Sequence, residues 1–107
     1  WEWQAVADYD GNYTYGCGTT INTSIANHWD SNHPDGTTAV GAFGTYGYGM
    51  CDMAGNVWEW TSSMYSDDQR IFRSGGWFSV DWSCTVSIST HHFPYFTERS
   101  VGFRVCR

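Results

Sequence analysis

The order of apolar and polar residues divides the chain into a short helical start, a long polar segment and a strand-rich second half. Residues 1–8 (WEWQAVAD) place Trp1, Val6 and two alanines on a potential apolar stripe, which predicts a short helix that is marginal without tertiary contacts. Residues 9–50 are rich in Gly, Asn, Ser, Thr and Asp, a composition typical of loops and turns. Such a long loop is uncommon in a compact domain unless a metal, a disulfide or buried aromatic side chains hold it in place.

Strand-like runs follow at residues 57–61, 70–77, 84–90 and 101–106. The second run (RIFRSGGW) alternates until Gly75 and Gly76, where we expect a bulge or a close backbone approach. The third run (CTVSIST) alternates with Cys84, Val86 and Ile88 on one face. The pattern therefore predicts an α+β domain with a small antiparallel sheet and a large loop region.

Composition and charge narrow the classes of partner. The 107 residues suffice for one domain, and they include 19% aromatic residues, no lysine and a net charge of −6. Nucleic acid and anionic membranes are disfavoured as partners, because both are bound by basic surfaces. No apolar run reaches the length of a membrane span, and no signal peptide is recognisable.

Four cysteines bear on the compartment and on metal binding. No two of them form a CxxC pair, which disfavours a zinc ribbon; the cysteines are Cys17, Cys51, Cys84 and Cys106. Their even number allows two disulfides in any of three connectivities. Asn12 and Asn22 each begin a triplet of the glycosylation acceptor type. Together with the absence of lysine, these features favour an extracellular or cell-surface protein.

Several ordered motifs resemble one known family. They are WEWQAVAD (1–8), ANHWD (26–30), GTTAVGAFGTYGYGMCDMAGNVWEWTSS (36–63), RIFRSGGW (70–77) and VGFRV (101–105). Their order and spacing resemble the formylglycine-generating enzyme family, also called the sulfatase-modifying factor family. The resemblance implies a C-type lectin-like fold with a small twisted antiparallel sheet and long irregular loops clamped by calcium. It covers residues 1–107 as the C-terminal two-thirds or less of a family domain, whose N-terminal strands are absent from this chain.

The resemblance implies a structural calcium ion at the GNVWEW segment. The implied ligands are the side chains of Asp52 and Glu59 and the carbonyl groups of Gly55 and Val57, which are hard oxygen donors of the kind that calcium prefers. This ion would explain a glutamate between Trp58 and Trp60, because it would neutralise a buried charge. The alternative is an edge strand in which Glu59 faces water.

A second calcium site is implied in the loop that follows ANHWD. Its ligands would be Asn27, the His28 carbonyl, Asn32 and the Pro34 carbonyl. Asn32 stands where the family usually has aspartate, which removes a charge. The alternative is an ordinary turn formed by Asn and Asp residues.

The family's oxidase chemistry depends on two cysteines that bind copper(I). Counting from Trp77, the second of these falls on Cys84, but the first falls on Ser79. A serine hydroxyl is not a copper(I) ligand, so the sequence disfavours both copper and catalysis. Cys84 is then expected to be a buried thiol or part of a structural disulfide. The adjacent His91 and His92 would point to opposite faces of a strand, which makes one shared metal awkward.

The leading interpretation is a non-catalytic ligand-binding domain. Its C-terminal stretch resembles the variable proteins of diversity-generating retroelements, a subgroup of the same family. The segment between Trp77 and Gly102 combines aromatic, hydroxyl and acidic side chains, as binding surfaces do. The predicted contact residues for a protein or glycan ligand are Phe78, Ser79, Asp81, Trp82, His91, His92, Phe93, Tyr95 and Phe96. Core positions are expected at Trp77, Val86, Ile88 and Phe103. The alternatives are self-assembly as a subunit of a surface filament or adhesin, and an active oxidase.

Overall fold

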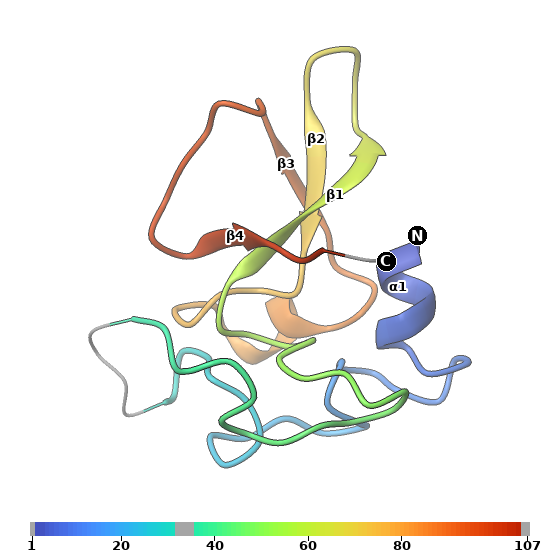
Figure 1. The fold of residues 1–107 in the computed structure, drawn as a ribbon, viewed down its shortest axis with the longest axis vertical. Helices are drawn as coiled ribbons and strands as arrows, with labels where there is room; N and C mark the ends of the chain where they lie inside the picture. Colours follow the sequence, from blue (N-terminus) through green and yellow to red (C-terminus); the bar gives the residue numbers. More distant parts are fainter. Residues whose placement is uncertain (1, 32–35, 106–107) are drawn as a thin grey trace.

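The computed structural model describes residues 2–31 and 36–105, and it places one sheet above a broad layer of loops (Figure 1). The elements in chain order are α1 (Glu2–Ala7), β1 (Trp58–Met64), β2 (Arg70–Arg73), the 3-10 helix η1 (Asp81–Cys84), β3 (Thr90–His92) and β4 (Val101–Phe103). The four strands lie in the order β3-β2-β1-β4. The short helix α1, the 3-10 helix η1, one small sheet and extensive loops confirm the predicted α+β class.

The predicted helix and the first two strands are confirmed with small changes of boundary. Strand β2 ends at Arg73 because Ser74 and Gly75 have left-handed backbones, with φ values of 97° and 69°. A Cβ atom at Gly75 would lie 2.6 Å from the Cys84 sulfur, so the backbone approaches Cys84 as closely as glycine permits. The close approach that was expected at this glycine pair is therefore present.

The run at residues 84–90 is not a strand, and this prediction is wrong. Cys84 ends η1, and regular pairing with β2 begins only at Thr90. The backbone N–H and the hydroxyl of Thr85 both donate to the Trp82 carbonyl, at 3.4 and 3.0 Å, and the Ile88 N–H donates to the Thr85 carbonyl at 3.2 Å. Hydroxyl groups that bond to nearby backbone in this way compete with a strand ladder, despite the alternating pattern.

The sheet is mixed, which differs from the antiparallel sheet that was expected. Pairing is antiparallel between β1 and β2 and between β2 and β3, but β4 runs parallel to β1, with Glu59 opposite Gly102. Strand β4 is an edge strand, and its Phe103 is 75% exposed rather than in the core. Of the other expected core residues, Val86 is buried, while Trp77 and Ile88 are half-buried.

The long loop segment is held by a buried hydrogen-bond network centred on Asn56. Its backbone N–H donates to the Asn27 carbonyl (2.8 Å), and its carbonyl accepts from the Trp77 N–H (2.8 Å). Its side-chain oxygen accepts from the Thr38 N–H (2.9 Å), and its side-chain nitrogen donates to the Thr38 carbonyl (3.3 Å). Asn56 thereby joins three loop segments to the start of β1.

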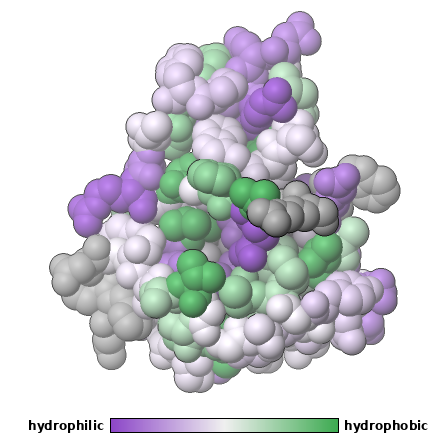
Figure 2. All heavy atoms as spheres, in the orientation of Figure 1, coloured by the Kyte–Doolittle hydropathy of each residue, from purple (hydrophilic) through white to green (hydrophobic). Residues whose placement is uncertain are grey.

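The apolar core is small and divided. One cluster contains Cys17, Ala26, Ala54 and Cys84, and a second contains Ala7, Met53 and Val86. Hydrophobic side chains also gather on the surface, across the middle of the face shown in Figure 2. No helix within the described ranges is long and apolar enough to span a bilayer.

Candidate ligand-binding site

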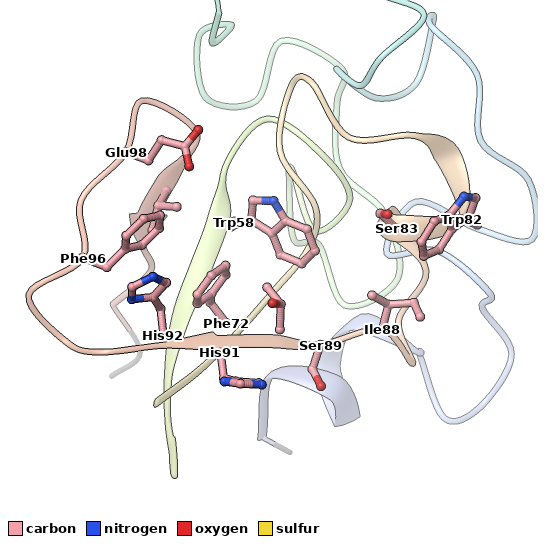
Figure 3. Close-up of a pocket in the computed structure, with 12 residues that line it drawn as sticks. Trp58, Phe72, Trp82, Ser83, Ile88, Ser89, His91, His92, Phe96 and Glu98 are labelled. Carbon is pink, nitrogen blue, oxygen red and sulfur yellow. The ribbon is translucent and has the colours of Figure 1, made fainter. Parts of the chain in front are cut away.

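A cavity of about 410 Å³ opens beside β3, between η1 and the segment that leads into β4 (Figure 3). We call it the aromatic cleft. The described residues that line it are Trp58, Phe72, Trp82, Ser83, Ile88, Ser89, Thr90, His91, His92, Phe96, Glu98 and Val101.

One wall of the aromatic cleft is a continuous series of contacting rings. Trp58 meets Phe72 edge-on with ring centroids 5.5 Å apart, and Phe72 lies nearly parallel to Phe96 at 6.4 Å. Phe96 in turn stacks on His92 at 3.9 Å. Because Phe72 is buried and Trp58 belongs to the central strand β1, this wall is anchored to the sheet. Rings that support one another in this way present their faces in a defined arrangement.

Trp82 and Ser83 in η1 lie across the cleft from that wall (Figure 3). The Asp81 carboxylate accepts a hydrogen bond from the Trp82 N–H (2.9 Å), which helps to hold the first turn of η1. The Trp82 side chain is nevertheless 63% exposed. Its indole is therefore available to a ligand and contributes little to the core.

The two histidines point in opposite directions, as strand geometry predicts (Figure 3). The His91 ring stacks on Tyr65 with centroids 3.4 Å apart, and its Nδ1 atom lies 2.6 Å from the side-chain oxygen of Gln69. His92 packs against Phe96 instead. A metal shared by both rings is not supported, and within the described residues no group of three or more His, Cys, Asp or Glu side chains forms a metal site.

The structure brings together only part of the predicted binding surface. Trp82, His91, His92 and Phe96 line the aromatic cleft, whereas Phe78, Ser79, Asp81, Phe93 and Tyr95 do not. Phe93 and Tyr95 form a stacked pair with centroids 5.4 Å apart, and Phe93 also meets His92 of the cleft edge-on at 5.7 Å. Tyr95 is 79% exposed. Phe78 packs against the exposed Trp29 at 5.7 Å. These two pairs extend the exposed aromatic surface beyond the cleft.

Sequence reasoning named four of the twelve described lining residues and missed the other eight, among them Trp58, Phe72 and Glu98. The pairing of β1 with β2 brings Trp58 and Phe72 together, and alternation alone does not say which face of these strands borders a cavity. Glu98 lies in the loop before β4, where no periodic signal exists. Trp29 was missed because its contact with Phe78 joins two segments far apart in the sequence, which are also linked by a hydrogen bond from the Trp29 N–H to the Ser79 carbonyl (2.9 Å).

Cys84 and Ser79 do not form the thiol pair of an oxidase. The Cys84 side chain is fully buried, and burial raises the pKa of its thiol to about 12, with smaller contributions from Cys17 and Asp81. The Ser79 hydroxyl accepts a hydrogen bond from the Gly76 N–H (2.9 Å) and so shapes the turn after β2. Cys17, Cys51 and Cys84 are free thiols, and Cys106 lies outside the described residues.

Native alkylation is expected to leave Cys84 unmodified. At pH 8 its thiol is protonated and inaccessible, whereas the partly exposed Cys51 is expected to react with iodoacetamide, because the thiolate is the nucleophile. Peptide mapping before and after denaturation measures both outcomes, and Cys84 should react only in the denatured chain. Rapid native labelling of Cys84, with protection by copper(I), would contradict the inert role.

Three of the four residues of the first implied calcium site lie around one small cavity, and Gly55 does not border it. Asp52, Val57 and Glu59 border a space of about 220 Å³, and Arg104 borders it as well. Asp52 accepts a hydrogen bond from the Gly41 N–H (2.7 Å), and the Gly55 carbonyl accepts one from the Ser74 hydroxyl (3.3 Å). Two carboxylates beside one cavity fit a hard cation, although Arg104 already supplies a positive charge there.

Glu59 is buried, and its carboxylate accepts three hydrogen bonds from protein groups. Arg104 donates to it from Nη2 (2.6 Å) and Nε (3.0 Å), and the Trp3 indole N–H donates at 2.6 Å. Burial alone would lower the pKa of Arg104, but the hydrogen bonds and the charge of Glu59 raise it above its ordinary value. The glutamate between two tryptophans thus has a protein partner, which excludes the alternative in which it faces water.

The second implied calcium site is only partly within the described residues. Asn27 is buried, and its side-chain nitrogen donates to the Gly36 carbonyl (3.1 Å) and to the Asn56 side-chain oxygen (3.3 Å). Its own side-chain oxygen is buried without a partner among the described residues, which is the kind of group that a cation or water would satisfy. The His28 carbonyl accepts from the Ser31 N–H (2.9 Å). Asn32 and Pro34 lie outside the described residues.

Comparison with known proteins finds one family model that matches the whole chain and several relatives. The family model described as "Sulfatase-modifying factor enzyme 1-like domain" matches residues 1–107. The chain is 30% identical to "Inactive C-alpha-formylglycine-generating enzyme 2" of Bos taurus, over 97% of this chain and 40% of that protein. It is 34% identical to the formylglycine-generating enzyme of Mycobacterium tuberculosis, over 65% of this chain and 27% of that protein. The chain thus spans about 40% or less of the length of these relatives.

Solved structures share the fold at lower identity. Treponema denticola variable protein 1 matches with a TM-score of 0.85 and 21% identity, covering 95% of this chain and 43% of that one. The structure of CarF matches with a TM-score of 0.80 and 23% identity, covering 95% of this chain and 42% of that one. These similarities show that the fold is shared over 95% of this chain.

Proposed function

Because this chain belongs to the sulfatase-modifying factor enzyme 1-like domain family, we propose that it is a non-catalytic ligand-binding domain of that family. The aromatic cleft carries the proposal, since concave sites with aromatic walls and a few polar groups are typical of ligand pockets. The buried thiol of Cys84 and the hydroxyl at Ser79 support a role without oxidase chemistry. The similarity to a protein named as inactive is consistent with the same role.

Replacing Trp82 and Tyr95 with alanine together is expected to abolish ligand binding without weakening the fold. Both side chains are mostly exposed, so their loss should change the free energy of unfolding by less than about 0.5 kcal/mol each. Binding is measured by ligand-observed NMR with a panel of cationic, neutral and anionic fragments, and stability by thermal melting.

Tyr48→Ala is the matched control, because Tyr48 is an exposed aromatic residue outside both the aromatic cleft and the 78–96 segment to which Trp82 and Tyr95 belong. It should retain the binding of the unmodified protein. A large loss of stability in the double variant would make Trp82 and Tyr95 core residues and would contradict the binding surface. Unchanged fragment binding in that variant would do the same.

We also propose that calcium stabilises the loop layer. Asp52 and Glu59, with the carbonyl groups of Gly55 and Val57, would hold one ion, and the unpartnered oxygen of Asn27 supports a second ion with the His28 carbonyl, Asn32 and Pro34. When bound, calcium would supply positive charge and fixed oxygen geometry rather than chemistry.

Removing calcium with a chelator is therefore expected to lower the melting temperature. An ion present at about a hundred times its dissociation constant stabilises a fold by about 2.7 kcal/mol, which is on the order of 10 °C for a domain of this size. Asp52→Asn should reduce this response, and Asp67→Asn, an exposed carboxylate in the loop between β1 and β2, should preserve it. Identical melting curves in calcium and in chelator would contradict the calcium proposal and would make Arg104 the partner that neutralises Glu59.

The extracellular or cell-surface location and the protein or glycan nature of the natural ligand stay predictions. Surface proteolysis of intact cells tests the location directly. Self-assembly stays the alternative function, and light scattering across a concentration series tests it.

A further inference from the structure

We propose that the aromatic cleft binds an alkylammonium group, an inference that rests on the proposed function as a ligand-binding domain. The observation behind it is a wall of contacting aromatic rings with one carboxylate at its rim. Trp58, Phe96 and His92 supply the rings, and Glu98 supplies the carboxylate (Figure 3).

The ring wall offers π faces to a cation. The faces of aromatic rings carry negative electrostatic potential, so a cation positioned over them is attracted, most strongly by tryptophan. Trp58 meets Phe72 edge-on, and Phe96 lies nearly parallel to Phe72 at 6.4 Å and to His92 at 3.9 Å. These contacts limit the rearrangement that the rings would need when a cation enters the cleft.

Glu98 decides the sign of the ligand's charge. Among the described lining residues it is the one carboxylate, and these residues include no lysine or arginine. Its backbone carbonyl accepts the Val101 N–H (3.1 Å), which ties the residue to the start of β4. A neutral ligand would remove water from this carboxylate without compensating its charge, and an anion would be repelled. An ammonium group would compensate it.

The rest of the chain reinforces this preference. Its net charge is −6 and it has no lysine, so the overall field attracts cations. Arg73 donates to the Val86 carbonyl (3.1 Å) and Arg104 pairs with Glu59 (2.6 Å). None of the four arginines in the described residues, Arg70, Arg73, Arg99 and Arg104, lines the aromatic cleft.

The cleft also has room for the molecule that carries the ammonium group. Its volume of about 410 Å³ falls within the range of small-ligand pockets. Ser83 and Ser89 provide hydroxyl groups away from the ring wall, and Thr90, the strand partner of Phe72, provides one beside it. These hydroxyls suit the polar atoms of a small amine or of a peptide that presents a lysine side chain. The ammonium group is common to both sources.

Binding titrations with charged probes and their uncharged counterparts test the proposal. Choline is compared with neohexanol, its uncharged carbon isostere. Nα-acetyl-lysine methylamide, which keeps its side-chain ammonium group, is compared with Nα-acetyl-norleucine methylamide. Both comparisons use ligand-observed NMR and calorimetry. Each cation is expected to bind about fivefold tighter or more than its neutral counterpart. The preference should weaken as salt is added, because part of it is electrostatic. Preference for choline identifies a small amine as the source, and preference for the lysine derivative identifies a protein side chain.

Two variants locate the binding, and a third is their control. Glu98→Gln removes the charge with little change of shape, and Phe96→Leu removes a ring while keeping an apolar side chain. Each should weaken cation binding by about fivefold. Asp67→Asn removes the same charge from an exposed loop outside the cleft and should leave the affinity unchanged.

The outcomes separate this inference from the function on which it rests. Equal affinity for charged and uncharged probes, or no effect of Glu98→Gln, overturns the alkylammonium assignment. If neutral fragments still bind in a manner that depends on Phe96, the ligand-binding function stands without it. If neither the charged nor the uncharged probes bind at the cleft, both proposals fail.

Discussion

Replacing Arg104 with methionine is expected to lower the free energy of unfolding by about 3 kcal/mol in the absence of calcium. The substitution leaves the Glu59 carboxylate buried beside Trp58 and Trp60 with only the Trp3 N–H as a donor. The two paired side chains are 21% and 5% exposed, so water replaces little of the lost interaction. Thermal and denaturant unfolding measure the loss, which should reach on the order of 10 °C or more in melting temperature.

Arg70→Met is the matched control, because that guanidinium donates to the Ser62 carbonyl at an exposed position (2.9 Å). It should change stability by less than about 1 kcal/mol. Combining Arg104→Met with Glu59→Gln should restore part of the stability, since the neutral amide can still accept the Trp3 hydrogen bond. An Arg104 variant as stable as the Arg70 variant in chelator would show that Glu59 does not depend on the guanidinium.

Replacing Gly55 with alanine is expected to prevent stable folding, with a loss above about 4 kcal/mol. Gly55 has φ of 74°, and an added Cβ atom would overlap the Asn27 carbonyl oxygen. That oxygen also accepts the Asn56 N–H, so moving it away would disrupt the network that holds the loop layer. Circular dichroism and the fraction of soluble protein report the result.

Gly49→Ala separates the steric overlap from backbone strain. Gly49 has φ of 82°, and nothing lies within 4 Å of the position that its Cβ would occupy. Alanine there should cost about 1 to 2 kcal/mol, the penalty of a left-handed backbone alone. If the Gly55 and Gly49 variants lose the same stability, the close approach to Asn27 is not what requires glycine at position 55.

The fold class and the first elements were accessible from sequence because their signals are local. The aromatic run at β1 and the Gly75-Gly76 break after β2 are signals of that kind. The direction of β4 was not accessible, since alternation in residues 101–106 is the same for a parallel and an antiparallel neighbour. The strand predicted at residues 84–90 was wrong because the Thr85 hydroxyl bonds to nearby backbone, which the alternating pattern does not reveal.

The candidate site was accessible only in part. An excess of aromatic residues after Trp77 indicated an exposed surface, and the exposure of Trp82 and Tyr95 agrees with it. The pairing of Glu59 with Arg104 spans 45 positions, and no spacing rule connects residues so far apart. Trp58 and Phe72 belong to the cleft only because β1 and β2 pair in one particular register.

The parallel pairing of β4 with β1 has a consequence for the order of folding during synthesis. Trp58 pairs with Val101, so the loop that must close to complete the sheet includes β2, η1 and β3. Until residue 104 leaves the ribosome, Glu59 lacks its arginine and β1 lacks one neighbour. The nascent chain therefore cannot complete its sheet in steps as it emerges, and its central strand remains open to other chains, a hazard that rises with the sequence separation of native contacts.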